Sequence, residues 1–167
     1  AVAERLGVRA PSLYAHVASV DELRRQLAVR SIPRVTDALT AAAAGRTGRD
    51  AVEAIVRAHV EYARSEPGRY SATLRPVNDD PELRALAMDA TRPLENILRG
   101  YGFDETECVH WYRAAFATAH GFAALHRDGV LSYDVAPDET LALITRQFAQ
   151  QVEAAARSRA GPFGERG

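Results

Sequence analysis

The sequence predicts an all-α protein, and three observations lead to this fold class. Apolar residues recur at helical spacing through most of the chain after residue 50. No segment sustains the alternation of apolar and polar residues that marks a half-buried strand. Gly45, Gly48 and Pro67-Gly68 stand between the periodic stretches, where helices end and the chain turns. These features favour a bundle of helices joined by short connections.

The first 35 residues predict three helical pieces in a particular order. A short helix ends at Gly7, which can take the positive φ of a tight turn. A second short helix begins near Pro11, and Ser19 and Glu22 have the spacing of a capping box that opens a long third helix. This order is the layout of a helix-turn-helix, so we expect a DNA-binding domain in residues 1–35.

Four further helices are predicted after this segment. They span about residues 50–66, 81–101, 104–127 and 137–157. The first carries a single apolar stripe from Val52 to Ala63. Pro93 lies inside the second pattern and is expected to kink or interrupt that helix. The third opens with Asp104 and Glu107 at capping-box spacing.

The predicted helix at 104–127 is apolar on more than one face. Phe116 lies on one apolar face and Phe122 on another, so both faces must be covered. We expect one face to join the core of the chain and the other to meet a second copy, in a homodimer through helices 104–127 and 137–157. The alternative is a helix buried entirely within one chain.

The composition is that of an ordinary globular protein, with 47% hydrophobic and 26% charged residues. No apolar run reaches the roughly 18 residues of a membrane-spanning helix, and no secretory signal is visible. The lone cysteine, Cys108, has no partner for an internal disulfide, which fits a reducing compartment. We therefore expect a cytoplasmic protein without membrane contact. Residues 161–167 are rich in glycine and charge and are expected to form a disordered tail.

Charge is distributed unevenly along the chain, although the net charge is only -1. Residues 1–34 hold six Arg against three acidic residues, whereas residues 35–167 hold fifteen Arg against nineteen. A basic end on a mildly acidic body is typical of a modular DNA-binding protein, because phosphates need cations on one face only. The alternative is chance fluctuation over a short stretch.

One string of residues in the first segment carries a family resemblance. It is Val2-Ala3-x-x-Leu6-Gly7-Val8-x-x-Pro11-Ser12-Leu13-Tyr14-x-His16-Val17, followed by Asp21-Glu22-Leu23. This string closely resembles the recognition region of the tetracycline-repressor (TetR) family. Where the family commonly has a phosphate-contacting Lys, this chain has Val20, which weakens that contact. The sequence opens inside the family's motif, so we expect the helix-turn-helix to be incomplete at its N-terminus.

The resemblance implies which residues meet double-stranded operator DNA. The implied contacts are Arg9, Ala10, Pro11, Ser12 and Ala15 at base edges or the DNA backbone, and Tyr14 and His16 at phosphates. Arg9 is the candidate for reading guanine, worth about 1–3 kcal/mol if bidentate, and a plain phosphate contact is the alternative. For Tyr14 and His16 the alternative is packing against the long third helix.

The body of the chain, residues 36–160, is expected to sense a ligand and to dimerise. It resembles, more weakly, the family's sensor domains that carry Trp111, His120-Gly121-Phe122 and Gly129. Polar groups on apolar helix faces are usual in ligand pockets. The candidates are His59, Tyr62, Tyr70, Met88, Trp111, Phe116 and His120. They indicate a small apolar or aromatic effector held by one or two hydrogen bonds; the alternative is ordinary core packing.

The resemblance implies a ligand-responsive transcriptional regulator, by family default a repressor, which binds a palindromic operator as a homodimer and is released by its effector. An enzyme is not expected, because the chain lacks the usual metalloprotease, phosphate-loop and nucleophile-elbow motifs. No metal or cofactor is expected either. The alternative function is a helical small-molecule-binding or interaction module without DNA binding.

Overall fold

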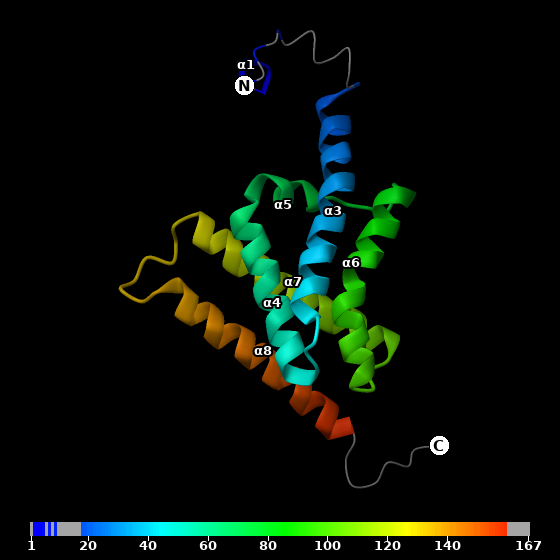
Figure 1. The fold of residues 1–167 in the computed structure, drawn as a ribbon, viewed down its shortest axis with the longest axis vertical. Coiled ribbons are helices and arrows are strands. Elements are labelled where there is room, and N and C mark those ends of the chain that lie inside the picture. The colour runs from blue at the N-terminus through cyan, green and yellow to red at the C-terminus, as the bar shows by residue number, and fades with distance from the viewer. Residues whose placement is uncertain (1, 6, 8, 10–17, 160–167) are drawn as a thin grey trace.

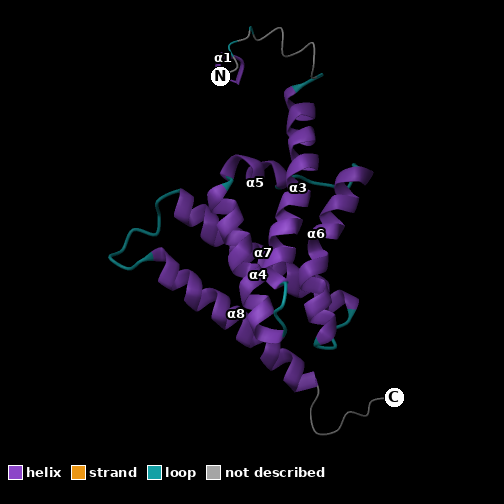
Figure 2. Cartoon of the chain, in the orientation of Figure 1, coloured by secondary structure: helices purple, strands orange, loops and turns teal. Residues whose placement is uncertain are grey.

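The computed structural model describes residues 2–5, 7, 9 and 18–159, and the regular structure of this part of the chain is entirely helical (Figures 1 and 2). The helices are α1 (Val2–Arg5), α3 (Val20–Ala43), α4 (Gly48–Ser65), α5 (Pro67–Thr73), α6 (Pro81–Gly100), α7 (Glu105–Arg127) and α8 (Pro137–Arg159). The predicted all-α class is confirmed for these residues. None of the described helices is both long and apolar enough to cross a membrane.

Helix α3 forms the axis of the body and begins at the Ser19 cap, as the sequence predicts, although the Glu22 side chain accepts from Gln26 and does not complete the predicted capping box. The Ser19 side chain caps it by accepting a hydrogen bond from the Glu22 backbone N–H at 3.0 Å. The second half of the helix is held by the bundle, since it lies between α4 and α6 and its Ile32, Val35 and Leu39 are buried. Its first turns extend beyond α5 and α6 (Figure 1).

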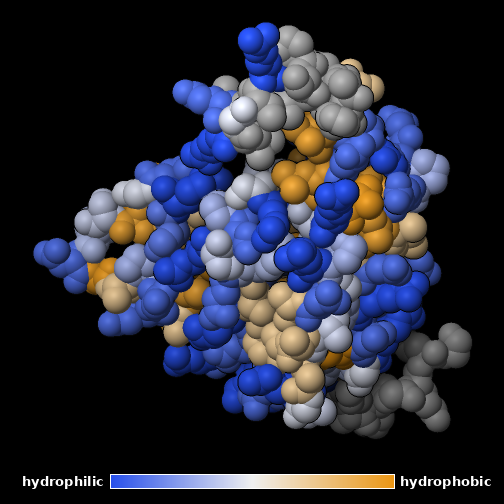
Figure 3. Space-filling view, turned by 45° about the horizontal axis from the view of Figure 1, so that its top comes forward, coloured by the Kyte–Doolittle hydropathy of each residue, from blue (hydrophilic) through white to orange (hydrophobic). Residues whose placement is uncertain are grey.

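The exposed first turns of α3 carry large apolar side chains. Val20, Leu23 and Leu27 are 50%, 40% and 38% exposed. Figure 3 shows apolar residues gathered on the surface at this end of the molecule. Leu23 and Leu27 are therefore not part of the described core.

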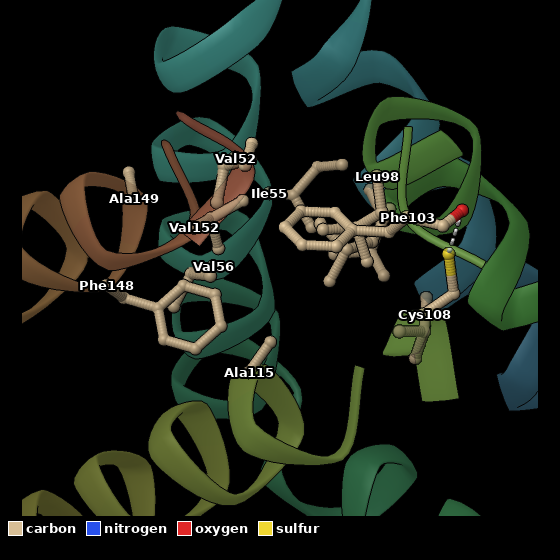
Figure 4. Packing of buried hydrophobic residues seen from close by; sticks show 14 residues of the cluster. Val52, Ile55, Val56, Leu98, Phe103, Cys108, Ala115, Phe148, Ala149 and Val152 are labelled. Atoms are coloured by element: carbon tan, nitrogen blue, oxygen red, sulfur yellow. Dashed lines mark hydrogen bonds between the residues drawn. The ribbon is translucent and has the colours of Figure 1, made fainter. Parts of the chain in front are cut away.

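The core of the body is built around α4. Its predicted stripe is confirmed, because Val52, Val56 and Ala63 are all buried. Figure 4 shows Val52 and Val56 facing Phe148 and further residues of α8, while α7 closes the cluster from below. The same helix also contacts α3, α6 and α7. Residues of α4 therefore reach every layer of the bundle, and a side chain on its buried face lies among several neighbouring helices.

Helices α6 and α7 each begin at an aspartate cap, and the cap of α7 is the one that the sequence predicts. The Asp80 carboxylate accepts from the backbone N–H groups of Glu82 and Leu83, and Asp104 and Glu107 form a complete capping box. The predicted interruption at Pro93 does not occur, since α6 runs through to Gly100. The missing hydrogen bond at the proline is tolerated because Ala90 and Leu94 beside it are buried and hold the helix in place.

Candidate functional site

The predicted DNA-reading segment is described only in part. Arg9 is exposed, whereas Ala10, Pro11, Ser12, Tyr14, Ala15 and His16 lie outside the described residues. Gly7 has a φ of 65°, and its N–H donates to the Glu4 carbonyl at 3.2 Å. A left-handed glycine directly after α1 fits the predicted turn, because that conformation is costly for residues with a Cβ. Arg9 is therefore accessible for the contact with DNA that the family resemblance implies.

A small cavity lies inside the body. Its volume is about 60 Å³, and its lining residues are Ile32, Val35 and Leu39 of α3, His59 of α4, Thr73 of α5, Ala87 and Ala90 of α6, and Tyr112 and Phe116 of α7. Five helices thus contribute to one space. The lining is mainly apolar, which is typical of a site for a small organic molecule.

His59 is a buried polar residue in this apolar lining. The side chain is 6% exposed, and its Nε2 has no hydrogen-bond partner. Burial, and secondarily the nearby His120, lower the pKa of His59 to about 4. The ring is therefore neutral near pH 7 and offers one donor and one acceptor. A buried polar group without a partner costs about 1–3 kcal/mol, and a bound molecule that pairs with it would recover that free energy.

Aromatic and imidazole rings surround His59. Its ring centroid lies 5.6 Å from that of Tyr70 and 5.3 Å from that of Phe116, both edge-on. The Tyr70 hydroxyl lies 3.3 Å from Nδ1 of His120 and donates to it in the tautomer that carries its proton on Nε2. Burial raises the pKa of Tyr70 to about 12, so this hydroxyl stays protonated. The structure thus brings together four of the predicted ligand residues, His59, Tyr70, Phe116 and His120, of which His59 and Phe116 line the cavity.

The other three predicted ligand residues lie elsewhere. Met88 is 64% exposed and lines a separate surface groove between α6 and α7. Trp111 packs against Phe103 and Phe148, so it belongs to the main core. The Tyr62 ring packs against core residues, and its hydroxyl is buried without a partner. Helical periodicity predicts that such side chains face inward, but it does not predict whether each one lines the cavity, lines the groove or packs in the main core.

Sequence reasoning missed Tyr112 as a site residue. It lines the cavity and stacks on Phe116, with ring centroids 6.2 Å apart. Its position four residues before Phe116, which in turn stacks on His120 four residues later, is the available signal, because residues four apart share one helix face. Tyr112 also lines the second groove, which has a volume of about 280 Å³. Tyr112 therefore belongs to the walls of both spaces.

Ion pairs connect the neighbourhood of the cavity to the start of α3. Arg75, two residues after the cavity residue Thr73, binds both carboxylate oxygens of Asp21 at 3.0 and 3.1 Å. We call the five charged residues of this region the α3 ion-pair cluster: Asp21, Arg25, Arg75, Asp80 and Glu82.

Within the α3 ion-pair cluster, Arg25 makes the second connection. Its guanidinium lies 2.6 Å from Asp80 and 2.6 Å from Glu82, at the start of α6. The Arg25 hydrogen bond lowers the pKa of Asp80 and keeps it ionised. The connector between α5 and α6, which joins two cavity-lining helices, is thereby held to the first turns of α3.

The described residues contain no group of three or more His, Cys, Asp and Glu side chains that could hold a metal ion. Cys108 is buried and donates a weak hydrogen bond to the Phe103 carbonyl (Figure 4). Burial raises the pKa of this thiol, which disfavours the reactive thiolate. The geometry around the cavity is suited to binding a molecule and holds no arranged nucleophile and base.

Comparison with known proteins gives matches at the level of family and of individual relatives. The family model described as "Tetracyclin repressor-like, C-terminal domain" matches residues 52–148. The chain is 38% identical over 133 residues to the uncharacterized HTH-type transcriptional regulator Rv0681 of Mycobacterium tuberculosis, covering 78% of this chain and 61% of that protein. It is 30% identical over 129 residues to the uncharacterized HTH-type transcriptional regulator YobS of Bacillus subtilis, covering 75% and 65%. The chain thus spans less than two thirds of the length of these relatives.

The fold also matches a solved structure. A protein with unknown function from Rhodococcus sp. RHA1 superposes with a TM-score of 0.70 at 21% sequence identity. The match covers 89% of this chain and 81% of that chain. At this level of identity the likeness concerns the fold alone, and it confirms the helical architecture predicted from the sequence.

Proposed function

Because this chain belongs to the family of tetracycline-repressor-like C-terminal domains, we propose that it acts as a ligand-responsive transcriptional regulator. The family and the names of its relatives support a regulatory, non-enzymatic role in the cytoplasm. In this proposal the segment before α3 binds a palindromic operator, and the body senses a small apolar or aromatic effector. The effector releases the protein from DNA, so the protein acts as a repressor.

One observation carries the sensing part of this proposal. His59 lines a mainly apolar cavity to which five helices contribute, and its buried Nε2 has no hydrogen-bond partner. A molecule that pairs with this nitrogen would favour the body conformation in which the pairing is best. By linkage it would weaken DNA binding only to the extent that it prefers that conformation. The α3 ion-pair cluster supplies a physical connection from the cavity to the helix that follows the DNA-reading segment.

The homodimer rests on apolar surface along the last two helices. Leu125 of α7 and Leu143 of α8 are 45% and 50% exposed. Small residues of α7, including Gly121, lie beside them and would let a second pair of helices approach closely. We propose a two-fold bundle of α7 and α8 with their symmetry mates, which would present two DNA-reading segments to two half-sites.

The DNA-binding part is tested by selecting operators from a library of random DNA duplexes with the purified chain. We expect a palindromic consensus whose half-sites lie about one helical turn, roughly 34–36 Å, apart. Binding of a labelled consensus duplex, followed by fluorescence anisotropy, should fall steeply as salt concentration rises. Failure to enrich any sequence, together with salt-independent binding, would favour the alternative of a small-molecule-binding or interaction module without DNA binding.

The role of Arg9 is tested in the same assay. If Arg9 reads a guanine, the Arg9→Ala variant should lose about 1–3 kcal/mol and relax the consensus at one position. If Arg9 contacts a phosphate, the variant should weaken all sequences equally and reduce the salt dependence. Arg46→Ala is the matched control, because Arg46 is an exposed arginine at the opposite end of α3.

A further inference from the structure

The cavity is only partly enclosed, and it is too small for an aromatic ring. Its volume is about 60 Å³. An apolar protein cavity that takes up benzene has a volume of about 150 Å³, and sites for larger ligands span about 300–1,000 Å³. An aromatic effector therefore cannot enter the cavity unless a lining side chain moves. The question is which of the lining side chains can move at the lowest cost.

Tyr112 is the lining residue with the best opportunity to move. It is only partly buried, and it lines both the cavity and the groove of about 280 Å³ between α6 and α7. Its hydroxyl makes no hydrogen bond to any other described residue, whereas Tyr70 is bonded to His120. Rotation of Tyr112 would break its stacking contact with Phe116 and would join the two spaces.

The groove is shaped to hold the remainder of a ligand that starts in the cavity. Its walls include Met88 and Val109, which are 64% and 42% exposed, so apolar surface there faces water. Covering that surface is favourable. The groove also carries Glu95, Glu105 and Arg113; Glu95 is paired with Arg99, which leaves one charge of each sign near the apolar walls. A neutral body with a polar outer end fits this lining better than a net charge of either sign.

We propose that Tyr112 is the gate of a two-part effector site and that the effector is an elongated, uncharged aromatic molecule. Its head carries one hydroxyl or carbonyl group that pairs with Nε2 of His59. Its body passes the displaced Tyr112 ring and lies in the groove against Met88 and Val109. This inference rests on the proposed function, since it takes the cavity to be the inner part of the effector site.

Calorimetric titration of the full chain with phenol and with 4-phenylphenol tests the proposal. The two probes share a hydroxyl-bearing ring, but only the second is long enough to reach past Tyr112. We expect 4-phenylphenol to bind at least about tenfold more tightly than phenol, because its second ring buries apolar surface in the groove. Equal affinities, or no binding of 4-phenylphenol up to its solubility limit, would overturn the two-part site.

Variants separate the two parts of the site. Val109→Trp fills the groove and should abolish the advantage of 4-phenylphenol while leaving phenol binding unchanged. Val130→Trp is the matched control, because Val130 is 58% exposed and lines neither space. Tyr112→Ala removes the gate and should raise the affinity for phenol severalfold, whereas Tyr112→Phe should behave as the parent chain. Circular dichroism and thermal melting establish that each variant is folded before titration.

The readout distinguishes failure of the gate from failure of the regulatory role. Binding is measured without DNA, and release of the selected duplex is measured separately. If 4-phenylphenol binds as expected but never releases DNA, the two-part site stands and the effector response fails. If 4-phenylphenol releases DNA equally well from the parent chain and from Val109→Trp, the regulatory role stands and the two-part site is wrong.

Discussion

At the scale of single residues, His59 connects folding to ligand binding. A neutral imidazole buried on α4 leaves one nitrogen unsatisfied, and the surrounding Tyr70 and Phe116 rings contact its edge without forming a hydrogen bond to it. Such an arrangement costs stability in the empty protein. At a binding site such a cost has a use, because the unpaired nitrogen favours molecules that can form a hydrogen bond with it over those that cannot.

The buried His59 makes the stability of the fold dependent on pH. Its pKa is about 4 in the folded chain and 6.5 when unfolded, so the unfolded state binds a proton more readily. Stability should be constant above pH 6.5 and should fall as the pH drops from 6.5 towards 4. We expect a loss of about 2 kcal/mol between pH 7.5 and pH 5, measured by urea unfolding.

Two substitutions assign this dependence to His59. His59→Leu removes the titrating group and should flatten the stability profile between pH 7.5 and pH 5. His110→Leu should leave the profile as it is, because His110 is exposed. An unchanged profile in the His59→Leu variant would show that other groups carry the acid sensitivity.

At the scale of the helices, capping decides where α7 begins. The Asp104 side chain accepts from the Glu107 backbone N–H at 2.9 Å, and the Glu107 side chain accepts from the Asp104 backbone N–H at 2.9 Å. Asp104→Ala removes one of these bonds and should lower the free energy of unfolding by about 1 kcal/mol. Thr106→Ala, an exposed position in the same turn, should change it far less. Chemical denaturation of the two variants gives the comparison directly.

The α3 ion-pair cluster joins α3 to the start of α6 but contributes little to the stability of the fold. Arg25→Ala removes the contacts with Asp80 and Glu82, which are exposed or partly exposed ion pairs worth about 1 kcal/mol or less. We therefore expect little change in thermal stability but a weaker effect of bound ligand on DNA affinity, by severalfold. Anisotropy titrations of the selected duplex with and without 4-phenylphenol measure this coupling.

A matched ion pair serves as the control for this coupling. Arg92→Ala breaks the contact with Asp89, which lies within α6 and joins no second element. It should leave both stability and ligand response close to those of the parent chain. If Arg25→Ala and Arg92→Ala behave alike, the connection between the cavity and α3 does not run through the α3 ion-pair cluster.

The helices themselves were largely predictable, because their signals are local. The apolar stripe of α4, the N-cap at Ser19 and the capping box at Asp104 each involve residues within a few positions of one another. The continuation of α6 through Pro93 was not predictable in this way. It depends on burial of Ala90 and Leu94 against other helices, which the local pattern does not contain.

At the scale of the whole molecule, the candidate site could be predicted only in part. His59, Tyr70, Phe116 and His120 share the signal of polar or aromatic groups on apolar faces, and they do meet. Met88 is also an apolar side chain on a predicted helix, yet it lines the surface groove and not the cavity. Which space a side chain enters depends on the directions of several helices at once, and periodicity within one helix does not encode those directions.

The proposed dimer makes a prediction for the whole assembly. Leu125→Glu and Leu143→Glu place a charge on the exposed apolar surface of α7 and α8, and each should convert the dimer to monomer. Leu74→Glu changes an exposed leucine on the connector after α5 and should leave the dimer intact. Sedimentation velocity of the three variants decides the matter; a parent chain that sediments as a monomer would contradict the proposed interface.

Because α3 is one continuous helix, a small tilt of its buried half produces a larger displacement at its exposed N-terminal end. Its buried half lines the cavity at Val35, whereas Val20 stands outside the bundle, about 22 Å further along the axis at 1.5 Å per residue. A tilt of about 5° near Val35 therefore displaces the far end by about 2 Å, and in a symmetric pair the two displacements add. A side-chain movement too small to disturb the core can in this way change the separation of the two DNA-reading segments, so that they no longer fit a rigid duplex.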